Sequence, residues 1–278
     1  GAKAADQASS ALERALKLRE SVYPGAQAVR LVYGESDQLP GLVVDRYGDV
    51  LAVQGLTLGM EVRAELVRAA LAQVFRPRGV MRMADSALRA LEGLPLERGV
   101  WWGEVPEQFQ VDIDGFSIEV DLYAGQKTGL YLDQRENRRR AGARASGQRV
   151  LDLFCYQGEW SLHAARGGAT AVLAVDSSAP ALAAARRNAE RNALADRITF
   201  RQGDCFDIVR ELERSSERFG LVILDPPALI KSRGALAGGA RAYREINRAA
   251  MGLLAEGGTL VTSSCSHHLE DPLFRQVL

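Results

Sequence analysis

The residues best suited to chemistry stand near the C-terminal end of the sequence, in the run Ser263-Ser264-Cys265-Ser266-His267-His268. A cysteine thiolate is a strong nucleophile, and neighbouring histidines can lower the pKa of the Cys265 thiol. A small buried hydrophobe is the plainer interpretation of a lone cysteine. No metal site is predicted, because the sequence does not offer four Cys and His ligands at zinc-like spacing.

A second candidate is Asp225-Pro226-Pro227, which directly follows the apolar run LVIL. Two consecutive prolines stiffen the backbone and remove two hydrogen-bond donors. They can therefore wall a slot for a planar base, with Asp225 pointing into that slot. A simple end to a strand is the alternative.

Acidic residues also mark three earlier apolar runs: Asp152 lies within RVLDLFC, Asp176 ends AVLAVD, and Asp204 follows ITFRQG. Ligands of doubly wound folds bind at the carboxyl ends of strands, where Asp176 can accept from both ribose hydroxyls and Asp204 can meet an adenine amino group. Gly158, in the turn after the first run, lets a ligand approach the backbone closely. A full G-x-G-x-x-G is missing, which favours a nucleoside ligand over a dinucleotide. A helix N-cap is the alternative for each lone aspartate.

The pattern of apolar and polar residues changes along the chain, and this change predicts two domains. Residues 146–278 alternate near-continuous apolar strands with helices, which indicates an α/β domain with a doubly wound, mostly parallel, Rossmann-like sheet. Residues 1–145 predict a smaller α+β domain, with helices near 9–20 and 60–75 and a hairpin about Asp114-Gly115. The stretch Gly234–Gly239 predicts a mobile loop.

Composition limits the class of protein. The 278 residues carry no net charge and lack both a ~20-residue apolar run and a signal pattern. Three scattered cysteines do not make a disulfide framework. We therefore expect a cytoplasmic protein without a membrane partner. Zero net charge argues mildly against a nucleic-acid partner. Charge can still be local, because arginines cluster at 135–144 and 186–191; two solvated helix faces are the alternative interpretation of these clusters.

Four segments together resemble a known family: GQKTGLYLDQRENR, VLDLFCYQGEWSLHAA, LVILDPPALIKSR and SSCSHH. They are similar to the RlmI-like family of S-adenosylmethionine-dependent ribosomal RNA large-subunit cytosine-5 methyltransferases, and the similarity runs from about residue 9 to the end. The resemblance implies a class I methyltransferase fold. It also implies S-adenosylmethionine as cofactor, S-adenosylhomocysteine as product and large-subunit ribosomal RNA as partner of a monomer or homodimer.

The resemblance also assigns roles to residues. It implies that Cys265 is the nucleophile that adds to carbon 6 of cytosine and that Asp225 holds the base's nitrogen edge. With the strand ends above, the predicted cofactor residues are Asp152, Phe154, Tyr156, Gly158, Asp176, Asp204, Asp225 and Gln134. The predicted RNA contacts are Lys127, Arg135, Pro226, Pro227 and Lys231. We expect Asp133 to cap the helix that follows it. A domain junction is the alternative for residues 126–135, and a solvated side chain the alternative for Lys231.

Four departures from the family pattern stand out. The RNA-binding PUA domain that begins family members, and the strands that follow SCSHH, are not found, so the chain looks truncated. Family members often read T-G-G-F where this chain has Gln157-Gly158-Glu159-Trp160, and the lost glycine narrows the expected cofactor loop. The second cysteine of many RNA cytosine-5 methyltransferases is missing at Pro227-Ala228. Two alternatives stay open: methylation of another base, such as a guanine nitrogen, and a non-catalytic RNA-binding module.

Overall fold

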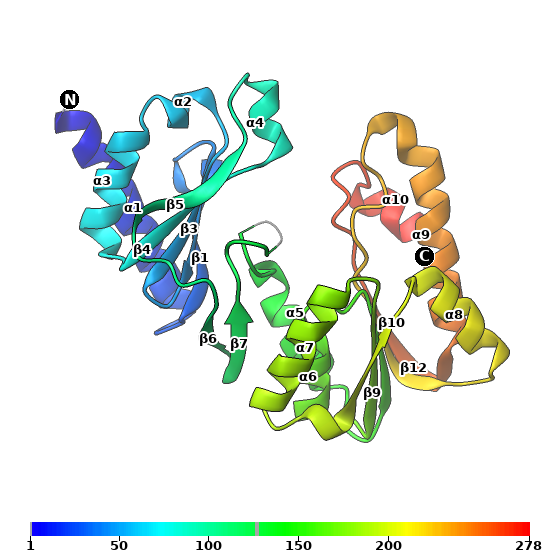
Figure 1. Cartoon of the computed structure of the whole chain (residues 1–278). Coiled ribbons are helices and arrows are strands. Elements are labelled where there is room, and N and C mark those ends of the chain that lie inside the picture. The colour runs from blue at the N-terminus through cyan, green and yellow to red at the C-terminus, as the bar shows by residue number, and fades with distance from the viewer. Residues whose placement is uncertain (1, 126–127) are drawn as a thin grey trace. The chain divides into compact units, whose positions relative to one another are not determined.

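The computed structural model describes residues 2–125 and 128–278, which divide into two compact units, Gly1–Asp133 and Gln134–Leu278 (Figure 1). The sequence placed the domain boundary between residues 145 and 146. The intervening helix α5 (Arg135–Gly142) belongs to the second unit, where it packs against α6 (Glu159–Arg166). Within the described residues, no helix combines the length and the apolar character that a membrane span requires.

A five-stranded mixed sheet forms the centre of the first unit, in the order β1-β2-β3-β4-β5. Its strands are β1 (Ala28–Tyr33), β2 (Leu42–Tyr47), β3 (Val50–Gly55), β4 (Gly79–Ala84) and β5 (Glu97–Gly103). Only β3 and β4 run parallel, and two helices connect them, α2 (Leu58–Glu61) and α3 (Ala64–Phe75). Helix α1 (Ala2–Val22) packs beside α3, and apolar residues of both join those of the sheet in one buried cluster.

Several expectations for this unit are confirmed and others are refined. The hairpin about Asp114-Gly115 is present as β6 (Phe109–Ile113) and β7 (Phe116–Val120). The helix expected over 60–75 is interrupted between Glu61 and Ala64, which gives α2 and α3 instead of one helix. Strands β4 and β5 and the short helix α4 (Ala87–Leu91) were not predicted.

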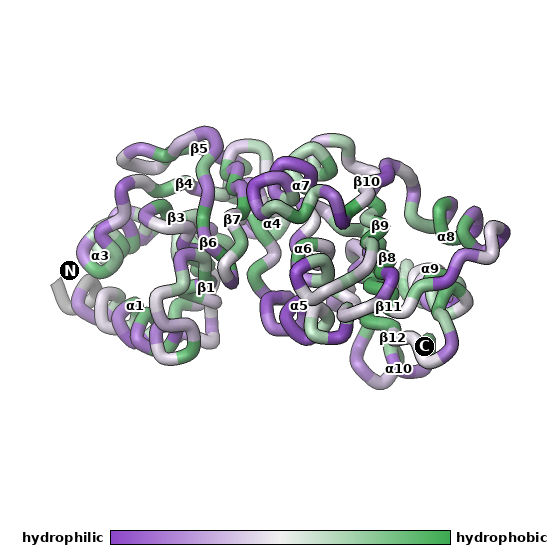
Figure 2. Tube along the Cα trace, turned by 90° about the horizontal axis from the view of Figure 1, so that it is seen from below, coloured by the Kyte–Doolittle hydropathy of each residue, from purple (hydrophilic) through white to green (hydrophobic). Residues whose placement is uncertain are grey.

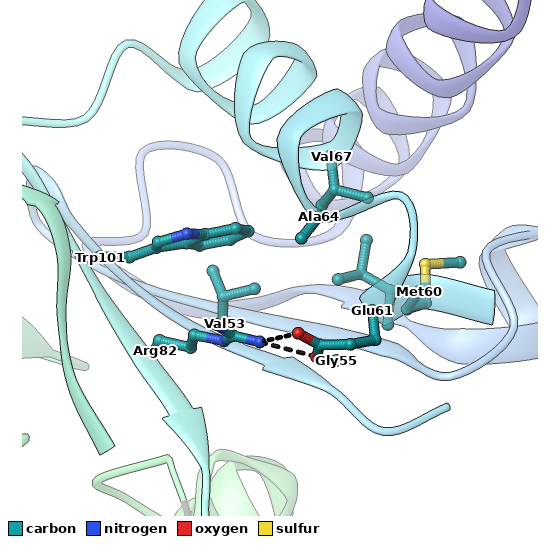
Figure 3. Close-up of a pocket in the computed structure, with 9 residues that line it drawn as sticks. Val53, Gly55, Met60, Glu61, Ala64, Val67, Arg82 and Trp101 are labelled. Carbon is teal, nitrogen blue, oxygen red and sulfur yellow. Dashed lines mark hydrogen bonds and ion pairs between the residues drawn. The ribbon is translucent and has the colours of Figure 1, made fainter. Parts of the chain in front are cut away.

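A charge cluster in this unit joins the fully buried Arg89 to Glu61 and Arg82, whose side chains are 26% and 22% exposed (Figure 3). The Arg89 side chain is fully buried, and its Nη2 donates to Glu61 Oε2 at 2.9 Å. Arg82 donates to both oxygens of Glu61 at 2.6 Å. The cavity beside these residues, lined also by Val53 and Trp101, measures about 20 Å³. That is room for a water molecule and not for a nucleoside.

A parallel sheet in the order β10-β9-β8-β11-β12 forms the second unit. Its strands are β8 (Arg149–Leu153), β9 (Ala171–Asp176), β10 (Ile198–Gln202), β11 (Phe219–Leu224) and β12 (Leu254–Thr262). Figure 1 shows α6 and α7 (Ala179–Arg191) on one face, and α8 (Cys205–Arg214) and α9 (Leu236–Gly252) on the other. The short helix α10 (Asp271–Val277) packs on α9. The predicted doubly wound α/β fold is confirmed, and its strand order reverses between β8 and β11.

Burial explains why these segments fold as they do. Val150, Leu151, Val222 and Ile223 in the central strands are completely buried, as strands covered on both faces must be. Figure 2 shows the contrast with α5, whose tube is largely hydrophilic. The apolar segments therefore form the buried sheet, and hydrophilic helices such as α5 cover it on the outside.

Two local predictions for this unit are wrong. The stretch Gly234–Gly239 is not a loop throughout, because α9 begins at Leu236. A Cβ at Gly239 would lie 2.3 Å from Ile230 Cγ1, so glycine here permits close packing of α9. Asp133 does not cap α5 either: the N-cap position is Gln134, which makes no side-chain cap hydrogen bond.

The charge cluster of the first unit gives a stability prediction. Replacing Glu61→Ala leaves the buried Arg89 guanidinium without its carboxylate, and we expect unfolding free energy to fall by about 3 kcal/mol in urea denaturation followed by circular dichroism. The exposed pair Arg68–Glu65 provides the control, since Glu65→Ala should change it by less than about 1 kcal/mol. Equal losses in the two variants would contradict the role of burial.

The ion pair between Glu61 and Arg82 also makes the stability of the fold depend on pH. Hydrogen bonds from Arg82 lower the pKa of Glu61 in the folded protein. Its stabilisation is therefore present above the pKa of the unfolded carboxyl, about 4.3, and is lost as pH falls through the lower folded pKa. The stability difference between wild type and Glu61→Ala should shrink in acid, measured by urea denaturation at pH 7 and pH 3. A difference that stays constant over this range would contradict the assignment.

Candidate active site

The parallel register brings four strand ends to one edge of the sheet. Leu153 of β8 lies level with Val175 of β9 and with Leu224 of β11, and Leu224 lies level with Thr262 of β12. The last residues of these strands, and the loops that leave them, include the residues singled out in the sequence. Asp152, Asp176, Asp225 and Cys265 therefore belong to neighbouring positions, as the strand-end argument predicts.

The loop after β8 holds an uncommon backbone conformation. Phe154 and Tyr156 have positive φ angles of 62° and 49°, and Gly158 has φ 80°. Asp176 fastens this loop, because its Oδ2 accepts from the Tyr156 backbone N–H at 2.9 Å and its Oδ1 from that of Ser178 at 2.8 Å. Non-glycine residues with positive φ are strained and tend to occur at ligand sites.

Asp152 is completely buried below this loop. Its Oδ2 accepts from the Ser161 hydroxyl at 2.5 Å, while its Oδ1 has no hydrogen-bond partner among the described residues. Burial is the main cause that raises the pKa of Asp152 to about 7; the carboxylates of Asp225 and Asp176 act in the same direction, and the hydrogen bond from Ser161 acts against it. A buried carboxylate with an unsatisfied oxygen favours a cationic partner.

Asp204 lies exposed at the end of β10 and caps α8. Its Oδ1 accepts from the backbone N–H groups of Phe206 at 2.8 Å and Asp207 at 3.3 Å. The Phe206 ring meets Phe154 edge to face, with ring centroids 6.3 Å apart. The N-cap alternative for Asp204 is thus realised, through one of its two carboxylate oxygens.

Asp225 is held through both carboxylate oxygens. Trp160 donates from Nε1 to Oδ2 at 3.0 Å, and the Ser263 hydroxyl donates to Oδ1. Neither donor was predicted, and both come from other elements, α6 and the loop after β12. The one hint in the sequence is that Trp160 stands where family members often have phenylalanine.

Cys265 differs from the other two cysteines of the chain. Its side chain is exposed, and Sγ donates to the carbonyl oxygen of Pro226 at 3.7 Å. Cys155 and Cys205 are buried, and burial raises the thiol pKa of Cys205 to about 12 and that of Cys155 well above its usual range. Cys265, next to the proline motif, is therefore the one cysteine of the three whose side chain is exposed at this edge.

A tyrosine absent from the predicted site anchors the cysteine loop. Tyr243 of α9 is fully buried, and its hydroxyl lies 3.0 Å from Ser264 Oγ and 2.9 Å from Ser266 Oγ. Ser266 Oγ also accepts from the Ile230 N–H at 3.1 Å, so it joins the proline loop to the cysteine loop. Nothing in the apolar pattern of α9 distinguishes this tyrosine from a core residue.

The remaining predicted residues lie farther out. Gln134 lines a groove of about 430 Å³ beside Trp160 and Ser263, and its Oε1 accepts from Asn137 Nδ2 at 2.8 Å. Lys231 is exposed. The other predicted residues are accounted for as follows: Arg135 is half-buried, Pro226 is buried, Pro227 is exposed, and Lys127 lies outside the described residues.

The departure at Glu159 has a structural explanation. The Glu159 carboxylate is buried and forms an ion pair with Arg138 of α5, whose side chain is also 5% exposed. The carboxylate that replaces the family's second glycine is therefore accommodated by α5.

Comparison with known proteins places the chain. Residues 81–274 match the family described as S-adenosylmethionine-dependent methyltransferases. The chain belongs to this family. Ribosomal RNA large subunit methyltransferase I of Aeromonas hydrophila is 42% identical over 257 residues, 91% of this chain and 65% of that protein. The protein of the same name from Photobacterium profundum is 40% identical over 98% of this chain and 68% of its own length.

These findings confirm the family recognised from the sequence motifs, and the chain spans about two thirds of the length of these relatives. Among solved structures, the methyltransferase-like SMU.776, crystallised with SAH, is 25% identical, with a TM-score of 0.85 over 99% of this chain and 71% of its own. The fold and the cofactor expected from the sequence, S-adenosylmethionine, are therefore those of the family.

The described residues of this methyltransferase fit that cofactor. The unsatisfied oxygen of Asp152 suits a cationic group. A Cβ at Gly158 would lie 3.1 Å from Ala185 Cβ, which explains why the loop needs glycine there. Asp176 holds the loop backbone through the hydrogen bond that it accepts from the Tyr156 N–H.

Asp152 gives a prediction for pH and stability. Its folded pKa of about 7 exceeds the unfolded value of about 3.9, so the folded state binds an extra proton between these values and loses stability as pH rises through them. Asp152→Asn lacks this titration. The melting temperature of the variant minus that of wild type should therefore increase from pH 5 to pH 8. The exposed Asp196→Asn is the control, and a flat difference for Asp152→Asn would contradict the shift.

Proposed function

We propose that this methyltransferase acts on large-subunit ribosomal RNA and methylates carbon 5 of a cytosine, with Cys265 as nucleophile. The observation that carries the proposal is the exposed Cys265 thiol, 3.7 Å from the Pro226 carbonyl, in a chain whose other two cysteines are buried. The names of the relatives support ribosomal RNA as substrate.

The cofactor residues proposed here surround the strained loop. Asp152, Phe154, Tyr156, Gly158, Asp176, Asp204, Asp225 and Gln134 are the proposed cofactor residues. When bound, S-adenosylmethionine supplies an electrophilic methyl group on a sulfonium centre. Three carboxylates near one another, Asp152, Asp176 and Asp225, favour such a cation electrostatically.

In the proposed reaction, Cys265 attacks the base and Asp225 holds it. The Cys265 thiolate forms a bond to carbon 6 of cytosine, and the ring electrons shift to make carbon 5 nucleophilic. Asp225, held by Trp160 and Ser263, receives hydrogen bonds from the base's nitrogen edge and stabilises the adduct. After carbon 5 is methylated, its proton leaves to a base, the carbon 5–carbon 6 double bond forms again and the sulfur–carbon bond breaks, which regenerates the thiolate.

The proposed RNA contacts are those expected from the sequence. We propose that Pro226 and Pro227 form the rigid wall of the slot and that Arg135 and Lys231 contact phosphates. Lys127, the third proposed phosphate contact, lies outside the described residues. A stacked base hides its ring face from the enzyme, so the target cytosine has to leave its stack to reach Cys265.

Cys265→Ala tests the chemistry. With the full-length protein, large-subunit RNA and S-adenosylmethionine, mass spectrometry of digested nucleosides should show 5-methylcytidine for wild type and at least a ~1,000-fold slower reaction for the variant. RNA carrying 5-fluorocytidine should trap a covalent adduct, because fluorine cannot leave carbon 5 as a proton would. Cys155→Ala, which keeps Cys265, should still form the adduct.

Other outcomes would overturn the proposal. A methylated guanine formed equally well by Cys265→Ala favours a reaction that needs no thiol. Bound RNA without any methylated nucleoside favours a non-catalytic RNA-binding module.

A further inference from the structure

We infer that Trp160 is a positioning residue: its indole N–H, together with the Ser263 hydroxyl, fixes the Asp225 carboxylate in one orientation at the catalytic edge. The inference rests on the proposed function, since it concerns how Asp225 meets the base. It adds a residue of α6 that neither the sequence motifs nor the proposed reaction assigns.

The hydrogen bonds at Asp225 leave little freedom to the carboxylate. Trp160 Nε1 donates to Oδ2 at 3.0 Å, and Ser263 donates to Oδ1. A carboxylate with one donor on each oxygen cannot rotate about its terminal bond without losing both hydrogen bonds, and each oxygen keeps a further lone pair for the base. Hydrogen bonds to an ionised group are also stronger than neutral ones.

The indole is itself held. Trp160 is 4% exposed, so its ring has little room to turn. The Arg138 guanidinium lies 6.0 Å from the centroid of that ring, and Arg138 is paired with the buried Glu159. Because Glu159 and Trp160 are consecutive at the start of α6, one buried ion pair sets the place of the ring whose N–H reaches Asp225.

The donor has to be an indole for chemical reasons. Phenylalanine fills similar space but offers no N–H, and indole can donate but not accept. The contact therefore presents Asp225 to the base as a hydrogen-bond acceptor. This is the form that a cytosine amino group recognises.

Two variants separate the N–H from the ring. Trp160→Phe removes the donor and part of the ring, while Trp160→benzothienylalanine replaces only the N–H by sulfur. We expect both to lower kcat for 5-methylcytidine formation by ~10- to 100-fold, the loss of one hydrogen bond to a charged group, with KM for S-adenosylmethionine within about twofold. Trp102→Phe, in the first unit, is the matched control and should keep kcat.

A spectroscopic measurement tests the contact without catalysis. The indole N–H resonance of Trp160, assigned by its loss in Trp160→Phe, should shift upfield in Asp225→Asn, while those of Trp101 and Trp102 stay in place. An unmoved Trp160 resonance, or wild-type kcat in both Trp160 variants, would overturn the inference. If wild type forms no 5-methylcytidine, the proposed function fails, and the resonance alone decides whether Trp160 holds Asp225.

Discussion

The parallel register of β9, β8, β11 and β12 is the constraint on which the rest of the second unit depends. It places Val175, Leu153, Leu224 and Thr262 level with one another, so that the segments after them leave the sheet together. Residues that lie up to about a hundred positions apart in the chain become neighbours without any direct sequence relation. Each loop then needs only a local device, such as a strained turn or a proline pair, to present its side chain.

Much of this arrangement could be predicted from the sequence because it follows from strand ends. The apolar runs before Asp176 and Asp225 are continuous, which identifies buried parallel strands and hence the edge where these carboxylates lie. Expectations failed where tertiary packing outweighs a local rule. Glycines 238 and 239 suggested a loop, yet the contact of Gly239 with Ile230 makes them part of a helix. Strand β5 was not predicted, because its residues are only half-buried and do not alternate regularly.

The supporting side chains could not be predicted for a different reason. Trp160, Ser263 and Tyr243 act through single hydrogen bonds that cross between elements, and neither periodicity nor motif spacing encodes such reach. The Arg138–Glu159 pair is of the same kind: it unites two charged residues that look solvated in a helical pattern. The strand-end pattern of the sequence thus predicts the candidate reacting groups, whereas the side chains that orient them become visible only in the fold.

The hydroxyl of Tyr243 has a consequence for motion. It meets Ser264 and Ser266 at once, and Ser266 also receives the Ile230 N–H from the proline loop. These hydrogen bonds tie the cysteine loop and the proline loop to α9 and to each other. We therefore expect a displacement of α9 to move both loops together, so that the separation of Cys265 and Pro226 changes less than the position of either.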